Sequence, residues 1–244
     1  MKILIPSAKD MNENEATVEA QAFSKEYEAV LDTMARMSAS ELADFYKISN
    51  PRAIKEYQRW QAILVNQAPY YPALDLFDGL MYRKIRRTDL TQEESAYLKE
   101  HLYITSALYG VIPAMQPIAP HRLDFLNNLK VDGKTLKAHW KDSYNQFGLD
   151  NEVIVSLLST EFEAIFANPI RDRFIRVKFM EHDGQRYRTH STISKKARGA
   201  FVTKLMEEQV TDVESMTQLS FADFEYQANL STNKELVFVK NIEA

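Results

Sequence analysis

Short apolar runs typical of strands alternate with amphipathic helical patterns along this 244-residue chain, and that alternation constrains the fold most. The runs KILIP at 2–6 and EVIVSL at 152–157 have the length and character of buried strands. No linker, repeat or low-complexity segment separates two halves. We therefore predict one compact domain over residues 1–244, of mixed α/β or α+β class, with a mixed sheet and surrounding helices.

The first third of the chain predicts three helices. Apolar residues at helical spacing indicate a helix over about 17–37, and a capping box beginning at Ser38 starts a second. Asn50 suits an N-cap and the proline after it suits the first helical position, so a third helix starts there. Residues 38–66 are thus a candidate helix-hairpin-helix element, in which free N–H groups would hold a phosphate. A plain αα-hairpin is the alternative, because the glycine usual in such hairpins is missing.

The remaining elements follow from the same patterns. In chain order they are a helix over 91–100 that starts with a capping box at Thr91, a strand within 101–110, a strand at 121–125, a helix over 136–147, a hairpin turning at Asp183-Gly184, a helix over 193–209 with Ala197, Phe201 and Leu205 on one face, and a closing strand pair at 224–229 and 235–240.

Several kinds of chemistry are excluded or unsupported. The chain has no cysteine, which rules out disulfides and thiolate nucleophiles. Its six glycines are too widely spaced for a dinucleotide fingerprint or a P-loop, and its histidines form no helical metal pair. We therefore predict no catalytic residue, cofactor or metal ligand. No signal peptide or apolar stretch of about 20 residues is visible, so we expect a cytoplasmic protein without a membrane segment.

Positive charge is concentrated in one segment of an acidic chain. Residues 171–204 hold ten basic and three acidic residues, a local charge of +7, whereas the whole chain carries −4. A local positive field of this kind favours an anionic partner; the alternative is a solvated face neutralised by acids distant in sequence. A second basic cluster, Arg83, Lys84, Arg86 and Arg87, either extends this patch or forms an exposed turn.

Two short motifs carry the strongest local signals. PSAKD places Lys9 just past the first strand, where ligands gather in α/β folds, so Lys9 is a candidate phosphate contact or amine nucleophile. SKKARG places Lys195 and Lys196 near the start of a helix. Cations there oppose the helix dipole, which indicates that an anion or nearby carboxylates compensate them.

These motifs together resemble a known family. PSAKD, ALYGV at 107–111, HRLDF at 121–125, HWKD at 139–142, SKKARG at 194–199 and ELVF at 235–238 are similar, in order and spacing, to the bacterial YaaA family of peroxide-stress proteins. The resemblance implies one mixed α/β domain with a helix-hairpin-helix element, a positive cleft and DNA binding, and a role in limiting iron-dependent oxidative DNA damage. The chain departs from the family where Pro6 precedes Ser7, and where VIPAMQP lacks the family's arginine and aspartate.

The leading hypothesis is therefore a non-enzymatic DNA-binding protein of the hydrogen peroxide response. It would bind double-stranded or locally distorted DNA mainly through counterion release, with little base specificity. The sequence does not determine the oligomeric state, and we take a monomer as the working expectation. The predicted phosphate contacts are Lys9, Asn50, Arg52, Arg122, Lys195, Lys196 and Arg198.

Two other functions are compatible with the sequence. The first is a DNA glycosylase or lyase that uses Lys9 or Lys195 as the nucleophile, because a hairpin, a positive cleft and a lysine are the parts such chemistry needs. The second is a protein-interaction or iron-handling role, in which carboxylates hold the metal and the basic patch is incidental.

Overall fold

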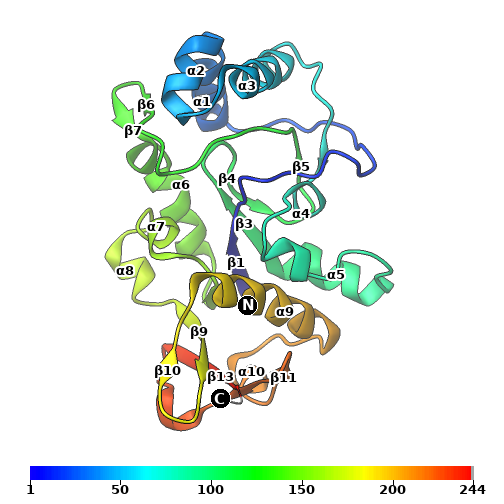
Figure 1. The fold of residues 1–244 in the computed structure, drawn as a ribbon, viewed down its shortest axis with the longest axis vertical. Helices are drawn as coiled ribbons and strands as arrows, with labels where there is room; N and C mark the ends of the chain where they lie inside the picture. The colour runs from blue at the N-terminus through cyan, green and yellow to red at the C-terminus, as the bar shows by residue number, and fades with distance from the viewer. Residues whose placement is uncertain (243–244) are drawn as a thin grey trace.

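A mixed sheet runs through the computed structural model, which describes residues 1–242 (Figure 1). Over these residues the sheet has nine strands in the order β11-β12-β13-β9-β8-β1-β3-β4, with β10 paired to β9. The strands are β1 (Lys2–Pro6), β3 (Leu102–Ser106), β4 (Gly110–Pro113), β8 (Ile154–Ser156), β9 (Ile175–His182), β10 (Tyr187–Arg188), β11 (Ser220–Phe221), β12 (Phe224–Tyr226) and β13 (Glu235–Asn241). Two small antiparallel pairs lie outside it, β2 (Tyr71–Pro72) with β5 (Pro117–Ile118) and β6 (Lys130–Val131) with β7 (Lys134–Thr135).

The centre of the sheet is parallel and its strands are buried. β1 pairs in parallel with β3 on one side, with Ile3 opposite Leu102, and with β8 on the other, with Lys2 opposite Ile154. Ile3, Leu4 and Ile5 have no solvent exposure, as expected for a strand covered on both faces. The carboxyl ends of β1, β3 and β8 therefore meet at one edge. The mixed α/β class predicted from the sequence is confirmed.

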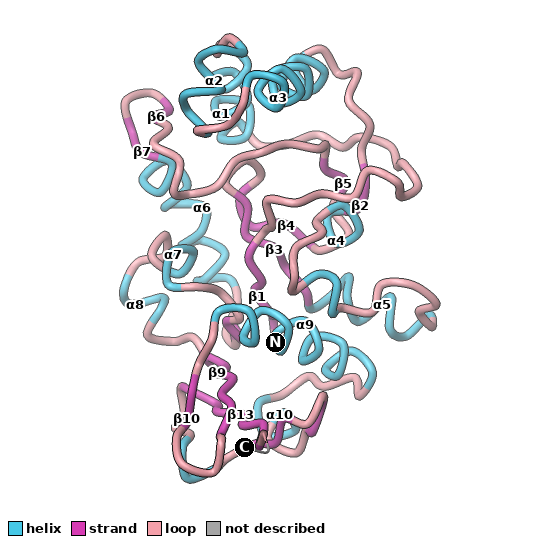
Figure 2. Tube along the Cα trace, viewed as in Figure 1, coloured by secondary structure: helices cyan, strands magenta, loops and turns pink. Residues whose placement is uncertain are grey.

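Helices surround the sheet, as Figures 1 and 2 show. Helices α1 to α3 lie together at one end of the long axis of the molecule, and α9 lies in the opposite half (Figure 1). The helices are α1 (Lys25–Ala35), α2 (Ala39–Tyr46), α3 (Asn50–Leu64), α4 (Ala73–Leu76), α5 (Gln92–His101), α6 (Leu136–Asp150), α7 (Thr160–Glu163), α8 (Asn168–Arg171), α9 (Ser191–Glu207) and α10 (Val213–Met216), with short 3₁₀ turns η1 (Tyr82–Lys84) and η2 (Ala228–Leu230).

Both predicted capping boxes are present. Ser38 accepts from the backbone amide of Glu41, whose carboxylate accepts from the Ser38 amide, and Thr91 and Glu94 do the same at the start of α5. These reciprocal bonds satisfy two of the amides that each helix start leaves free.

Two helix starts differ from the prediction. α1 begins at Lys25 after an N-cap at Ser24, because residues 19–23 have no regular secondary structure and Val18 forms an isolated bridge with Tyr70. The N-cap of α3 is Ser49, so Asn50 is already helical and does not cap. Proline tolerates either of the first helical positions, since neither amide there has a partner inside the helix.

The strand predicted at 121–125 is wrong. This segment has no regular secondary structure. Its backbone follows local turns instead, because Asp124 Oδ1 accepts from the amides of Leu126 and Asn127. The proline-containing segment before it packs into the core, with Ile118 fully buried.

The C-terminal elements agree with the predictions. β9 and β10 form the hairpin that turns at Asp183-Gly184, and Gly184 has φ +83, which a glycine adopts without strain. β12 pairs antiparallel with β13. The face of α9 that carries Ala197, Phe201 and Leu205 is buried.

Candidate nucleic-acid interface

Lys9 lies at the edge where the parallel strands end. The Ser7 amide donates to the carbonyl oxygen of Thr105 at 3.1 Å, which extends the pairing of β1 and β3 beyond the strand. Lys9 Nζ then lies 2.9 Å from Asp124 Oδ2, and the Lys9 side chain is 57% exposed. Lys9 therefore forms an exposed ion pair with Asp124 at this edge, where an anion can reach it.

Arg122 links the α2–α3 hairpin to this edge. The Tyr46 hydroxyl, at the end of α2, donates to the Arg122 carbonyl oxygen, and the Arg122 guanidinium lies 5.5 Å from the centre of the Tyr46 ring. Trp60 of α3 donates its indole N–H to the same hydroxyl at 3.3 Å. Since Asp124 is two residues further on, the hairpin, Arg122 and Lys9 are held in one connected arrangement.

The hairpin presents the start of α3 to solvent. The C-cap of α2 is Lys47, which adopts the left-handed conformation with φ 54, and no side chain caps the first turn of α3. Asn50 and Arg52 are exposed. An uncapped first turn leaves backbone N–H groups free, and free N–H groups at a helix start bind phosphate well. The geometry is that of an αα-hairpin, and its DNA-binding role stays a prediction.

Other cations of α3 are neutralised. Lys55 Nζ lies 3.2 Å from Glu13 Oε1, and Arg59 bonds both Glu13 and Glu56, the latter at 2.7 Å. Burial raises the pKa of Glu56, and Arg59 opposes that rise. Among residues 1–242 the Arg52 side chain has no polar partner, so Arg52 is the cation of α3 that remains available.

The SKKARG motif divides into buried and exposed residues. Ala197 and Gly199 face the core, and a Cβ at Gly199 would lie 2.1 Å from the Met81 carbonyl oxygen. Lys195 and Lys196 are exposed, and no carboxylate within residues 1–242 forms an ion pair with either. Arg198 is half-buried, and its Nη2 donates to the Leu158 carbonyl oxygen at 3.3 Å.

Only some of the cations in the basic segment 171–204 lack a polar partner. Arg176 pairs with Glu163, Arg188 with Asp183 and Lys204 with Glu208. Arg173 donates to three backbone carbonyl groups. The cations whose side chains have no polar partner within the described chain are Lys178, Arg186, Lys195 and Lys196.

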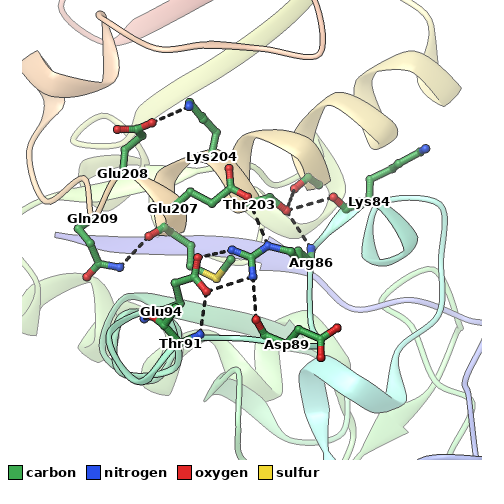
Figure 3. Close-up of polar contacts among 12 residues, drawn as sticks. Lys84, Arg86, Asp89, Thr91, Glu94, Thr203, Lys204, Glu207, Glu208 and Gln209 are labelled. Atoms are coloured by element: carbon green, nitrogen blue, oxygen red, sulfur yellow. Dashed lines mark hydrogen bonds and ion pairs between the residues drawn. The ribbon is translucent and has the colours of Figure 1, made fainter.

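The three arginines of the second basic cluster are structural, as Figure 3 shows for Arg86, whereas Lys84 is exposed and its ammonium has no polar partner among residues 1–242. The Arg86 guanidinium bonds Glu94 of α5 and Glu207 of α9, while the Arg86 amide donates to the Thr203 hydroxyl at 2.9 Å. Arg87 donates to the carbonyl groups of Leu74, Asp75 and Phe77, and Arg83 pairs with Asp78. These arginines join η1 to its neighbours, so they do not extend a free positive patch.

Carboxylates near this edge were missed by sequence reasoning. Burial raises the pKa of Glu161 in α7, and Asp124 raises it further, whereas Lys137 and Lys9 oppose the rise. Glu163 is the last residue of α7, and its Oε1 accepts a hydrogen bond from Ser156 Oγ at 2.5 Å. Ser156 ends the clearest predicted strand, so the rule that ligands gather at strand ends could have singled it out.

The predicted site residues form two groups. Lys9, Arg122, Asn50 and Arg52 belong to the strand edge and the hairpin, whereas Lys195, Lys196 and Arg198 belong to α9, which Figure 1 places away from the hairpin along the long axis. Within residues 1–242, no cluster of three or more acidic or histidine side chains could hold a metal ion. No helix in that same range is both long and apolar enough to cross a membrane.

The fold and the exposed cations of α9 define a mixed α/β protein with a candidate anion-binding surface. A family described as peroxide stress protein YaaA matches residues 1–230, and the chain belongs to that family. UPF0246 proteins of Streptococcus pneumoniae strains CGSP14, ATCC 700669 and JJA are each 54% identical over 242 residues, which cover 99% of this chain and all of each relative. The resemblance drawn from the sequence motifs is confirmed.

Proposed function

We propose that this chain binds DNA through the phosphate backbone, as part of the peroxide response of its family. The observation that carries the proposal is the exposed pair Lys195 and Lys196, which has no ion-pair partner within residues 1–242. The buried Ala197 and Gly199 fix the orientation of the helix that presents this pair. Adjacent cations without ion-pair partners, on a helix held in place, are suited to a phosphate contact that does not depend on base sequence.

The position of the two lysines favours an anion. They lie in the second turn of α9, near the positive end of the helix dipole. A cation in the first turn of a helix costs about 0.3–1 kcal/mol and this cost fades beyond that turn, so the dipole acts on Lys195 and Lys196 only weakly. A DNA phosphate would relieve both that repulsion and the repulsion between the two neighbouring ammonium groups.

The hairpin supplies a second contact. Arg52 and the free amides at the start of α3 would bind a phosphate as helix starts do elsewhere. Lys9 and Arg122 lie between the hairpin and the strand edge and add positive charge there. Binding of double-stranded or locally distorted DNA at these contacts would cover backbone that radicals otherwise attack, which accounts for a protective role without catalysis.

A salt titration tests the proposal. Fluorescence anisotropy of labelled duplex, mismatched-bubble and single-stranded DNA is measured for the wild type and for the double variant Lys195→Ala, Lys196→Ala. Each lost phosphate contact lowers the slope of log affinity against log salt by about 0.9 on duplex DNA, so the double variant should lose about two units of slope. The double variant Lys99→Ala, Lys130→Ala removes two exposed lysines elsewhere and is the matched control. Equal salt slopes in both double variants would contradict the proposal.

A second assay tests the protective role. Supercoiled plasmid is exposed to ferrous iron and hydrogen peroxide, and nicked product is measured with and without protein. The wild type should reduce nicking in proportion to the DNA that it covers, and the Lys195→Ala, Lys196→Ala variant should not. Equal protection by both proteins would show that the protection does not require DNA binding by α9.

A further inference from the structure

A small polar pocket lies beside the carboxyl end of β8 and the first half of β9, between α7 and the first half of α9. Its volume is about 280 Å³. Such a volume is at the lower end of the range for small-molecule sites. The charged side chains on its wall are Glu163, Arg176, Lys178, Arg198 and Glu235.

Both carboxylate oxygens of Glu163 already accept a hydrogen bond. Its Oε1 accepts from the Ser156 hydroxyl at 2.5 Å, and its Oε2 accepts from Arg176 Nε at 2.9 Å. The charge of this carboxylate is therefore balanced by Arg176 and not by Arg198, which has no carboxylate within ion-pair distance in the described part of the chain.

Arg198 has no carboxylate partner in the pocket. Its Nε is buried and has no hydrogen-bond partner, and its Nη2 makes one long bond to the Leu158 carbonyl oxygen at 3.3 Å. Burial lowers the pKa of Arg198, and the more distant Glu163 only partly opposes this. A guanidinium remains protonated at neutral pH, so the structure holds a half-buried cation whose buried Nε–H lacks an acceptor.

We propose that this pocket binds the phosphomonoester group of a small ligand, such as a nucleoside 5′-monophosphate or the terminal phosphate of a DNA strand. The Nε–H and Nη–H edge of a guanidinium matches two phosphate oxygens, and a dianion balances Arg198 together with the unpaired Lys178. The hydroxyl groups of Thr189 and Ser194 on the same wall supply further donors. The limited volume favours a terminal group over a continuous strand.

This site is distinct from the exposed lysines of α9. Lys195 and Lys196 point to solvent, whereas Arg198, two residues further along the helix, lines the pocket. The inference goes beyond the proposed DNA binding and does not depend on it.

Isothermal titration calorimetry with inorganic phosphate and with deoxyadenosine 5′-monophosphate tests the inference. The wild type should bind both, and deoxyadenosine without the phosphate should not bind. Arg198→Gln should weaken binding by at least about thirtyfold, as expected for truncating a buried charged partner. Arg198→Lys should not restore it, because an ammonium lacks the paired donors. Lys195→Ala, Lys196→Ala should leave nucleotide affinity within about twofold, since both side chains are outside the pocket.

The inference is overturned if neither probe binds the wild type at millimolar concentration, or if Arg198→Gln binds them equally well. Should Arg198→Gln fail to fold, as judged by circular dichroism, the exposed Lys178→Ala takes its place, and unchanged phosphate affinity in that variant also overturns the inference. A duplex with and without a 5′-phosphate distinguishes the two sources of ligand. Tighter binding of the phosphorylated duplex, with competition by the nucleotide, assigns the pocket to DNA ends, and nucleotide binding without that preference assigns it to a free nucleotide.

Discussion

Gly199 of α9 lies against the backbone of Met81 so closely that a Cβ on Gly199 would be 2.1 Å from the Met81 carbonyl oxygen. The same Cβ would be 2.8 Å from Lys84 Cβ. The last residue of the SKKARG motif is therefore required for packing between α9 and η1. The cations that precede it owe their placement to this contact.

Gly199→Ala should destabilise the protein. In an exposed helix the change would stabilise by about 1 kcal/mol, but here the steric conflict is with backbone and should produce a net loss of about 1–3 kcal/mol. Urea unfolding measures the free energy of unfolding. Ala200→Gly, one position further along α9, is the control for a change in helix propensity together with the loss of a half-buried methyl group. A Gly199→Ala protein more stable than wild type would show that the two segments do not approach this closely.

His121 should make the protein sensitive to mild acid. Burial lowers the pKa of His121 to about 4, a hydrogen bond to the Ala119 carbonyl oxygen at 2.9 Å opposes this, and Arg59 lowers it further. Between pH 4 and 6.5 the unfolded state binds the proton and the folded state does not, so the free energy of unfolding rises with pH across that window. The full difference is about 3 kcal/mol, lost progressively as pH falls from about 6.5 to 4.

The measurement is urea unfolding of wild type and His121→Gln at pH 4.5, 5.5 and 7. The variant lacks the titrating group, so its stability should change less over this range than that of the wild type. Parallel pH dependences in the two proteins would mean that His121 is accessible to protons in the folded state.

Lys9 should not act as a Schiff-base nucleophile. Its ammonium group lies 2.9 Å from the Asp124 carboxylate, and the amine must lose its proton to attack a carbonyl carbon. Borohydride reduction in the presence of DNA that carries an abasic site should therefore trap no covalent adduct. An adduct that forms with wild type and disappears in Lys9→Ala would instead support the lyase alternative.

Arg52→Ala should weaken duplex binding at all sequences to a similar degree. A phosphate contact carries no base information, and its loss should lower the salt slope by about one unit. Fluorescence anisotropy with two unrelated duplex sequences measures both effects. Lys55→Ala is a matched control, because Lys55 lies on the same helix but is paired with Glu13 at 3.2 Å. If both variants bind as the wild type does, the hairpin makes no contact with DNA.

Local sequence patterns were sufficient to predict most of the helices and strands. The capping boxes at Ser38 and Thr91 were predicted because a cap needs only residues three apart in sequence, and the buried face of α9 followed from helical spacing. The strand predicted at 121–125 failed because its alternating apolar residues pack against the hairpin and the core, with no neighbouring strand to pair with. The spacing of apolar residues predicts which side chains are buried, but it does not predict which part of the fold covers them.

The sequence by itself determined the family, the mixed α/β class and the concentration of positive charge in residues 171–204, because motif order, periodicity and charge are all properties of the linear chain. Only the tertiary structure decided which of those charges are free. Arg176 and Lys204 form ion pairs with carboxylates, Lys195 and Lys196 are exposed to solvent, and Arg198 is half-buried with an unpaired Nε–H. The physical reason is that the field at a side chain depends on groups within a few ångströms, and in a folded chain those groups can come from distant parts of the sequence.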